Sequence, residues 1–172
     1  MIIVKSYQKN YFFFVESFLS TFLARFYRAG FGDIENYWMG LDEIYSMTKA
    51  PNNYKLRIEL KSFDFPNAVN WIEYDHFSVD SVSSQFKLNL GIADKESNIQ
   101  DAMYFNKEQK FSTFDKNEGI AQNLTSCSIE RSRTGWWWPV DEFEQNGRLN
   151  CGHSNLNGVY HDAEFNGGYK RF

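Results

Sequence analysis

An alternation of apolar and charged side chains in residues 54–63 constrains the fold of this chain more than any other feature. The segment reads YKLRIELKSF, and charged residues separate its apolar residues Leu56, Ile58 and Leu60. Successive side chains of a β-strand point to opposite faces of the sheet. The pattern therefore predicts a half-buried antiparallel strand with one face in water.

The same alternation returns, less strictly, in residues 69–79 (VNWIEYDHFSV) and again in residues 86–90 (FKLNL). Turn-rich pieces separate the three segments, so we expect an antiparallel meander. Apolar residues at helical spacing occur within residues 18–31, where Gly30 and Gly32 close the segment, and within residues 37–48, behind Gly40. These two segments predict short helices beside the sheet.

Regular periodicity ends after Gly91, and the rest of the chain carries isolated aromatic residues among Asp, Asn, Gly and Ser. Segments of this length without periodicity are usually functional or disordered when they occur in a compact domain. The tryptophans and cysteines in this part favour an ordered, functional loop region.

The composition fits one compact domain and excludes several functions. A chain of 172 residues with 19% aromatic residues has enough apolar area for a packed core. Its formal net charge is -4 and its charges are interspersed, which argues against a nucleic-acid-binding protein. No stretch reaches the roughly 18 to 20 apolar residues of a membrane-spanning helix, so we expect no membrane insertion.

The chain shows no motif of an enzyme. It contains no nucleophile elbow, zinc-ligand pair, phosphate-binding loop or dinucleotide fingerprint. We therefore expect a binding protein with no catalytic residue.

Cys127 and Cys151 are the only cysteines, and the residues alone leave two interpretations open. The pair forms one disulfide, or both remain buried free thiols. A disulfide would contribute roughly 3 kcal/mol by restricting the unfolded chain.

A series of short strings occurs in one order along the chain. The strings are Phe31-Gly32, YWMGL at 37–41, LRIEL at 56–60, YDHFSV at 74–79, FSTFD at 111–115, GWW at 135–137, Cys151 and NLNGVY at 155–160. Together they resemble the fibrinogen C-terminal domain family, which includes domains of ficolins, tachylectins, angiopoietins and tenascins. The resemblance implies an α+β fold with a central antiparallel sheet, short helices and a loop-rich ligand-binding lobe.

The resemblance divides the chain into an atypical leader, residues 1–15, and a partial family domain, residues 16–172. Complete family domains extend further at both ends, so we expect a truncated domain. The leader has features of a poor signal peptide. Alternatively, its Ile2, Val4 and phenylalanine run have the β-propensity to supply a strand.

Family members are secreted and bind carbohydrates, acetylated groups or protein partners, often as oligomers carried on a stalk. The resemblance therefore implies an extracellular, lectin-like module of the innate immune type that binds glycans or acetylated groups. A protein-binding module of the signalling or matrix type is the alternative, and a non-functional fragment is a third interpretation. We expect an oligomer only in a full-length parent.

The family's calcium loop follows its Phe-Ser-Thr string, which corresponds here to Asp115, Asn117 and Gly119. Asn117 and Gly119 stand where the family has aspartates, so this calcium site is degraded. A turn stabilised by Asp, Asn and Gly is the other interpretation of this loop.

The family's ligand pocket implies a further set of site residues. The predicted ligand-binding residues are Cys151, Gly152, His153, Asn155, Tyr160 and Trp138. Trp138 has two interpretations, a core residue or a platform that stacks on a sugar. Residues 139–150 (PVDEFEQNGRLN) form an insertion whose acids favour a basic or polyhydroxylated ligand, and Asn123 begins a glycosylation sequon.

Overall fold

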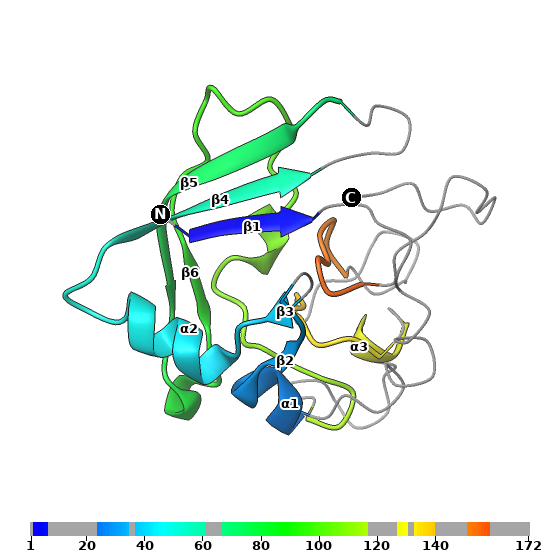
Figure 1. The fold of residues 1–172 in the computed structure, drawn as a ribbon. Helices are drawn as coiled ribbons and strands as arrows, with labels where there is room; N and C mark the ends of the chain where they lie inside the picture. Colours follow the sequence, from blue (N-terminus) through cyan, green and yellow to red (C-terminus); the bar gives the residue numbers. More distant parts are fainter. Residues whose placement is uncertain are drawn as a thin grey trace.

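The computed structural model describes residues 2–6, 24–34, 37–60, 67–116, 127–130, 133–139 and 151–158 (Figure 1). Its helices are α1 (Ala24–Ala29), α2 (Leu41–Thr48) and α3 (Cys127–Glu130), with single 3-10 turns η3 (Val82–Ser84) and η4 (Tyr104–Asn106). Its strands are β1 (Ile2–Ser6), β2 (Phe31–Gly32), β3 (Tyr37–Trp38), β4 (Tyr54–Leu60), β5 (Asn70–Val79) and β6 (Leu88–Leu90). The described helices include none with the length and apolar character of a membrane span.

The predicted antiparallel meander is confirmed, because β4, β5 and β6 pair in sequence order. Strand β1 adds a fourth strand, which lies parallel to β4 with Ile2 opposite Leu56 and Ser6 opposite Leu60. The idea that the leader supplies a strand is thus confirmed for Ile2–Ser6. The parallel pairing of this strand was not expected.

A β-bulge in β5 explains why its alternation is less strict than that of β4. Tyr54 pairs with Phe77, but Leu56 pairs with Tyr74, so β5 has one residue more than β4 in this interval. The bulge changes which residues face inward, and Phe77 and Val79 are buried after it.

The outer face of the sheet carries the charged residues that the alternation in β4 predicts. The Arg57 guanidinium contacts the Glu59 carboxylate at 2.9 Å and lies 4.1 Å from the centroid of the Trp71 ring. The inner face of β4 buries Leu56 and Ile58 in the core.

The predicted second helix begins later than its sequence pattern indicates. Tyr37 and Trp38 form β3, which pairs with β2, and α2 begins only at Leu41. The helix ends at Thr48, whose buried hydroxyl donates to Ile44 O and accepts the backbone N–H of Val79 at the end of β5. This hydroxyl therefore joins α2 to the sheet.

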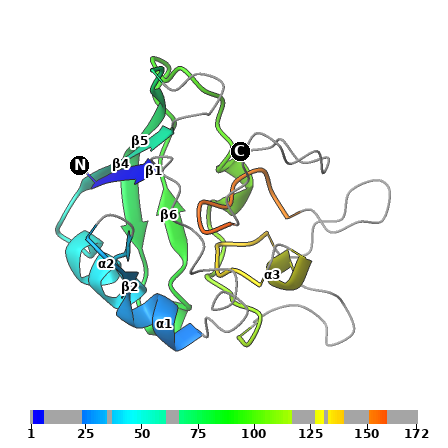
Figure 2. The same ribbon diagram turned by 45° about the vertical axis from the view of Figure 1, so that its right-hand side comes forward.

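The loop region packs directly on the sheet instead of forming a separate unit. The backbone of Leu88 in β6 exchanges hydrogen bonds with residues 108 and 109, and Ser112 exchanges two with Trp136. In Figures 1 and 2 the sheet, α1 and α2 lie on one side of the molecule, and α3 and segment 151–158 lie on the other. One hydrophobic core spans both sides.

Tyr74 connects β5 to the start of the loop region. Its side chain is fully buried, and its hydroxyl donates to Asp101 Oδ1 at 2.6 Å. The same oxygen accepts the backbone N–H of Met103, so it fixes the turn that precedes η4.

We predict that deletion of residues 1–6 destabilises the domain, because it leaves the backbone edge of β4 without its parallel partner. The free energy of unfolding should fall by roughly 2 kcal/mol or more, measured by denaturant titration. Replacement of residues 2–6 by a Gly-Ser segment of equal length should have the same effect. An unchanged midpoint in both variants would show that β1 contributes nothing to stability.

We predict that Tyr74 makes the domain sensitive to alkaline pH. Burial raises the pKa of the Tyr74 phenol, and the hydrogen bond to Asp101 raises it further. The pKa of Tyr74 in the folded protein lies above its value of about 10 in the unfolded chain. The stabilisation that the neutral phenol provides is therefore complete below about pH 10 and is lost as the pH rises above it. Between pH 9 and 11 the loss should be at most about 1.4 kcal/mol.

The Tyr74→Phe variant provides the comparison. It should be less stable at neutral pH by about 1 to 2 kcal/mol, since it lacks the bond to a carboxylate, but its stability should fall less between pH 9 and 11. Parallel pH slopes for the two proteins would contradict the role of Tyr74.

Candidate functional site

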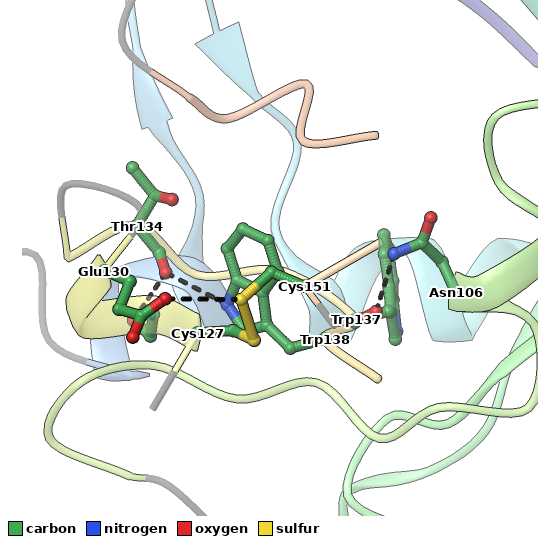
Figure 3. Close-up of a disulfide and its surroundings, with 8 residues drawn as sticks. Asn106, Cys127, Glu130, Thr134, Trp137, Trp138 and Cys151 are labelled. Carbon is green, nitrogen blue, oxygen red and sulfur yellow. Dashed lines mark hydrogen bonds between the residues drawn. A yellow bond between two sulfur atoms is a disulfide. The ribbon is translucent and has the colours of Figure 1, made fainter. Parts of the chain in front are cut away.

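The predicted cysteine pair is bonded, which rules out the alternative of two free thiols. Cys127 and Cys151 form a disulfide with their Cα atoms 5.4 Å apart, and both residues are buried. Cys127 begins α3, and Cys151 begins the described segment 151–158, so the bond joins two pieces of the loop region that are 24 residues apart (Figure 3). Glu130 Oε2 lies 4.0 Å from Cys151 Sγ.

Trp138 is a core residue, and the sugar-stacking role predicted for it is wrong. Only 2% of its surface is exposed, and its indole N–H points to Thr134 O at 3.4 Å (Figure 3). Neither face of the ring is open to a ligand. Trp136 and Trp137 are equally buried, so all three consecutive tryptophans serve packing.

Gly152 and His153 lie beside Tyr104 and Phe105 of η4, and two of these four residues, Tyr104 and His153, are exposed. The His153 ring packs edge-on against the Phe105 ring at 5.3 Å, and Phe105 packs edge-on against Tyr104 at 5.4 Å. Tyr104 is 68% exposed, and His153 is also exposed. We call Tyr104, Phe105, Gly152 and His153 the recognition edge.

The backbone of the recognition edge depends on a glycine. Gly152 has a φ of +71°, in the left-handed region that L side chains rarely adopt. A Cβ at this position would lie 3.6 Å from Phe105 Cβ and 3.4 Å from Asn106 Nδ2. Asn106 is itself fully buried, and its side chain donates to Trp137 O at 2.9 Å.

Asn155, which was predicted to bind ligand, faces the protein instead. Its Nδ2 donates to Thr134 Oγ1 at 2.9 Å, and its backbone carbonyl oxygen accepts the backbone N–H of Gly158. Asn157 donates to Gly135 O at 3.0 Å. These bonds fix the segment in a turn, so Asn155 supports the site without presenting its amide to solvent. Tyr160, the remaining predicted ligand-binding residue, lies outside the described residues.

The predicted calcium loop is described only up to residue 116, so Asn117 and Gly119 lie outside the described residues. The Asp115 carboxylate already accepts the backbone N–H of Ala24 at 3.1 Å and the Thr113 hydroxyl at 2.6 Å. Within the described ranges, no group of three His, Cys, Asp or Glu residues could hold a metal ion. Asp115 therefore acts at the start of α1, and calcium binding stays a prediction.

The sequon at Asn123 and the acidic residues of the insertion also lie outside the described residues. Glycosylation and the preference for a basic or polyhydroxylated ligand therefore stay predictions.

Tyr104 and Phe105 were not among the predicted site residues. They precede Cys151 by more than 40 residues in the printed sequence, and only the fold brings them to His153. The sequence carries a weak signal for these two residues, because the adjacent aromatic residues Tyr104 and Phe105 are followed by the polar residues 106–110 and then by the Phe-Ser-Thr string.

Comparisons with known proteins agree with this architecture. Residues 20–169 match the family described as fibrinogen beta and gamma chains, C-terminal globular domain. The chain is 34% identical to tenascin-R of Gallus gallus over 143 residues, and 36% identical to angiopoietin-related protein 3 of Homo sapiens over 135 residues. These alignments cover 83% and 78% of this chain but 9% and 25% of the relatives.

A solved structure has the same fold. The fibrinogen-like globe domain of human ANGPTL6 superposes with a TM-score of 0.67 at 29% sequence identity. The match covers 83% of this chain and 56% of that domain, so the chain spans about half of the solved domain's length.

We predict that Asp115 stabilises α1 without a metal ion. Asp115→Asn should lower the free energy of unfolding by about 0.5 to 1 kcal/mol in EDTA, because a carboxylate at a helix N-terminus is favourable. Thermal melts in EDTA and in calcium chloride measure the effect. A loss of stability that appears only in calcium would instead assign Asp115 to a metal site.

Proposed function

Because the chain belongs to the family of C-terminal globular domains of fibrinogen beta and gamma chains, we propose that it is an extracellular module that binds a protein partner through the recognition edge. The relatives are secreted matrix and signalling proteins, tenascins and angiopoietin-related proteins, and are not enzymes. This relationship favours the protein-binding alternative over the lectin-like function that the sequence first suggested.

The exposed aromatic residues of the recognition edge are the observation that carries this proposal. Tyrosine is enriched in protein interfaces, because its ring buries a large area and its hydroxyl forms a hydrogen bond at little cost in entropy. Tyr104 is 68% exposed, and the Phe105 ring contacts both the Tyr104 ring and the His153 ring, so the three rings form one row. A row of this kind offers a partner a rigid, amphipathic contact surface.

Two further observations weaken the case for a carbohydrate ligand. Trp138, which was the candidate for sugar stacking, is buried, and the Asn155 amide is turned toward Thr134. Binding of glycans or acetylated groups therefore stays a prediction that the following experiment tests directly.

The experiment measures binding of the purified chain to extracellular matrix deposited by cultured cells. We expect binding that is lost when the matrix is treated with trypsin and unchanged by an excess of N-acetylglucosamine. Competition by the acetylated sugar would restore the lectin-like interpretation. Absence of binding to this matrix, with or without trypsin, would contradict the proposal.

Single substitutions test whether the recognition edge makes the contact. Tyr104→Ala and His153→Ala should each weaken binding by about tenfold, which is typical of a residue near the centre of an interface. Tyr37→Ala is the matched control, since Tyr37 is 65% exposed but lies in β3, which is not part of the recognition edge. Equal losses in all three variants would show that the contact is not at the recognition edge.

A further inference from the structure

We infer that Thr134 is the positioning residue of the recognition edge, a role that rests on the proposed function of that edge. Thr134 is fully buried, and both of its oxygens accept hydrogen bonds from other segments of the loop region. Its carbonyl oxygen accepts the Ser128 hydroxyl at 2.6 Å and faces the Trp138 indole N–H at 3.4 Å. Its Oγ1 accepts Asn155 Nδ2 at 2.9 Å.

These bonds connect Thr134 to both halves of the disulfide. Ser128 directly follows Cys127 in α3, and Asn155 follows Cys151 by four residues. The chain therefore forms a closed ring that runs from Cys127 through the disulfide to Cys151, on to Asn155, across to Thr134, and back through Ser128. Gly152 and His153 lie on the part of this ring between Cys151 and Asn155.

Without the other bonds of the ring, the disulfide would hold segment 151–158 at one end only. The described part of this segment has no helix or strand that would hold it in place. A second attachment at Asn155 restricts the rotation of the intervening residues about the disulfide, and so determines where His153 meets Phe105. The Thr134 hydroxyl supplies the attachment at Asn155, and the bond from Asn157 Nδ2 to Gly135 O holds the segment two residues further along the chain.

The orientation of the Asn155 amide supports this role. Asn155 Oδ1 is buried and has no hydrogen-bond partner among the described residues. The bond from Nδ2 to Thr134 Oγ1 is thus the side-chain hydrogen bond that the structure gives Asn155. Without the Thr134 hydroxyl, the amide would be buried with neither end bonded, which favours a shift of the segment toward solvent.

Thr134→Val is the direct test, because valine keeps the shape and the backbone carbonyl but lacks Oγ1. In NMR spectra of the isolated chain, we expect the largest changes of amide shifts at Gly152 and His153. Binding to the cell-deposited matrix should weaken roughly 5- to 30-fold, which is the range for loss of one hydrogen bond to a buried polar group. Thr134→Ser retains the hydroxyl and should restore both properties.

Thr48→Val is the matched control for a purely structural effect. Thr48 is also a buried threonine with its hydroxyl in two hydrogen bonds, but it joins α2 to β5. We expect this variant to be less stable, with unchanged shifts at Gly152 and His153 and unchanged binding. Equal changes at these two residues in both valine variants would overturn the inference.

A second variant keeps the test decisive if Thr134→Val does not fold. Asn155→Leu removes the same hydrogen bond from the other side, and should change the shifts of Gly152 and His153 in the same way. Unchanged shifts in the Asn155 variant, or in a folded Thr134→Val protein, would overturn the inference and leave the proposed function intact. Failure of the wild-type chain to bind matrix would contradict the proposed function, whereas the shifts would still decide the role of Thr134.

Discussion

The packing of Trp137 between the two sides of the molecule is the interaction on which the rest of the structure depends. Its indole N–H donates to Phe86 O at 2.8 Å, and its ring lies against Phe111 and Trp38 at centroid distances of 5.1 and 6.2 Å. Tyr27 extends this cluster to α1. The rings of Tyr27 and Phe111 lie so close to the Gly135 backbone that a Cβ at this position would clash with both of them.

This aromatic core gives irregular segments a fixed position without regular secondary structure. Aromatic side chains bury large areas per residue, so a few of them can hold a loop in place. The disulfide and Thr134 then add local links that a loop cannot obtain from a ladder of backbone hydrogen bonds. The recognition edge is thus built on loops but supported by a rigid core, an arrangement common in binding proteins.

Tyr74 and Thr48 show how the sheet is linked to its surroundings through single hydroxyl groups. Tyr74 reaches from β5 to Asp101, two residues before Met103, and so positions the turn that leads into η4. The Thr48 hydroxyl connects α2 to the end of β5 by accepting the backbone N–H of Val79. The orientation of Tyr104 and Phe105 is therefore coupled to the sheet, although both residues lie outside it.

The sequence by itself determined the antiparallel meander, because the alternation in β4 follows directly from the two-residue repeat of a strand. It also determined the family, through strings such as FSTFD and GWW. Only the tertiary structure decided the parallel pairing of β1, the bulge in β5 and the site. The burial of Trp138 and the contact between His153 and Phe105 depend on segments far apart in the chain, and no local pattern specifies which of them meet.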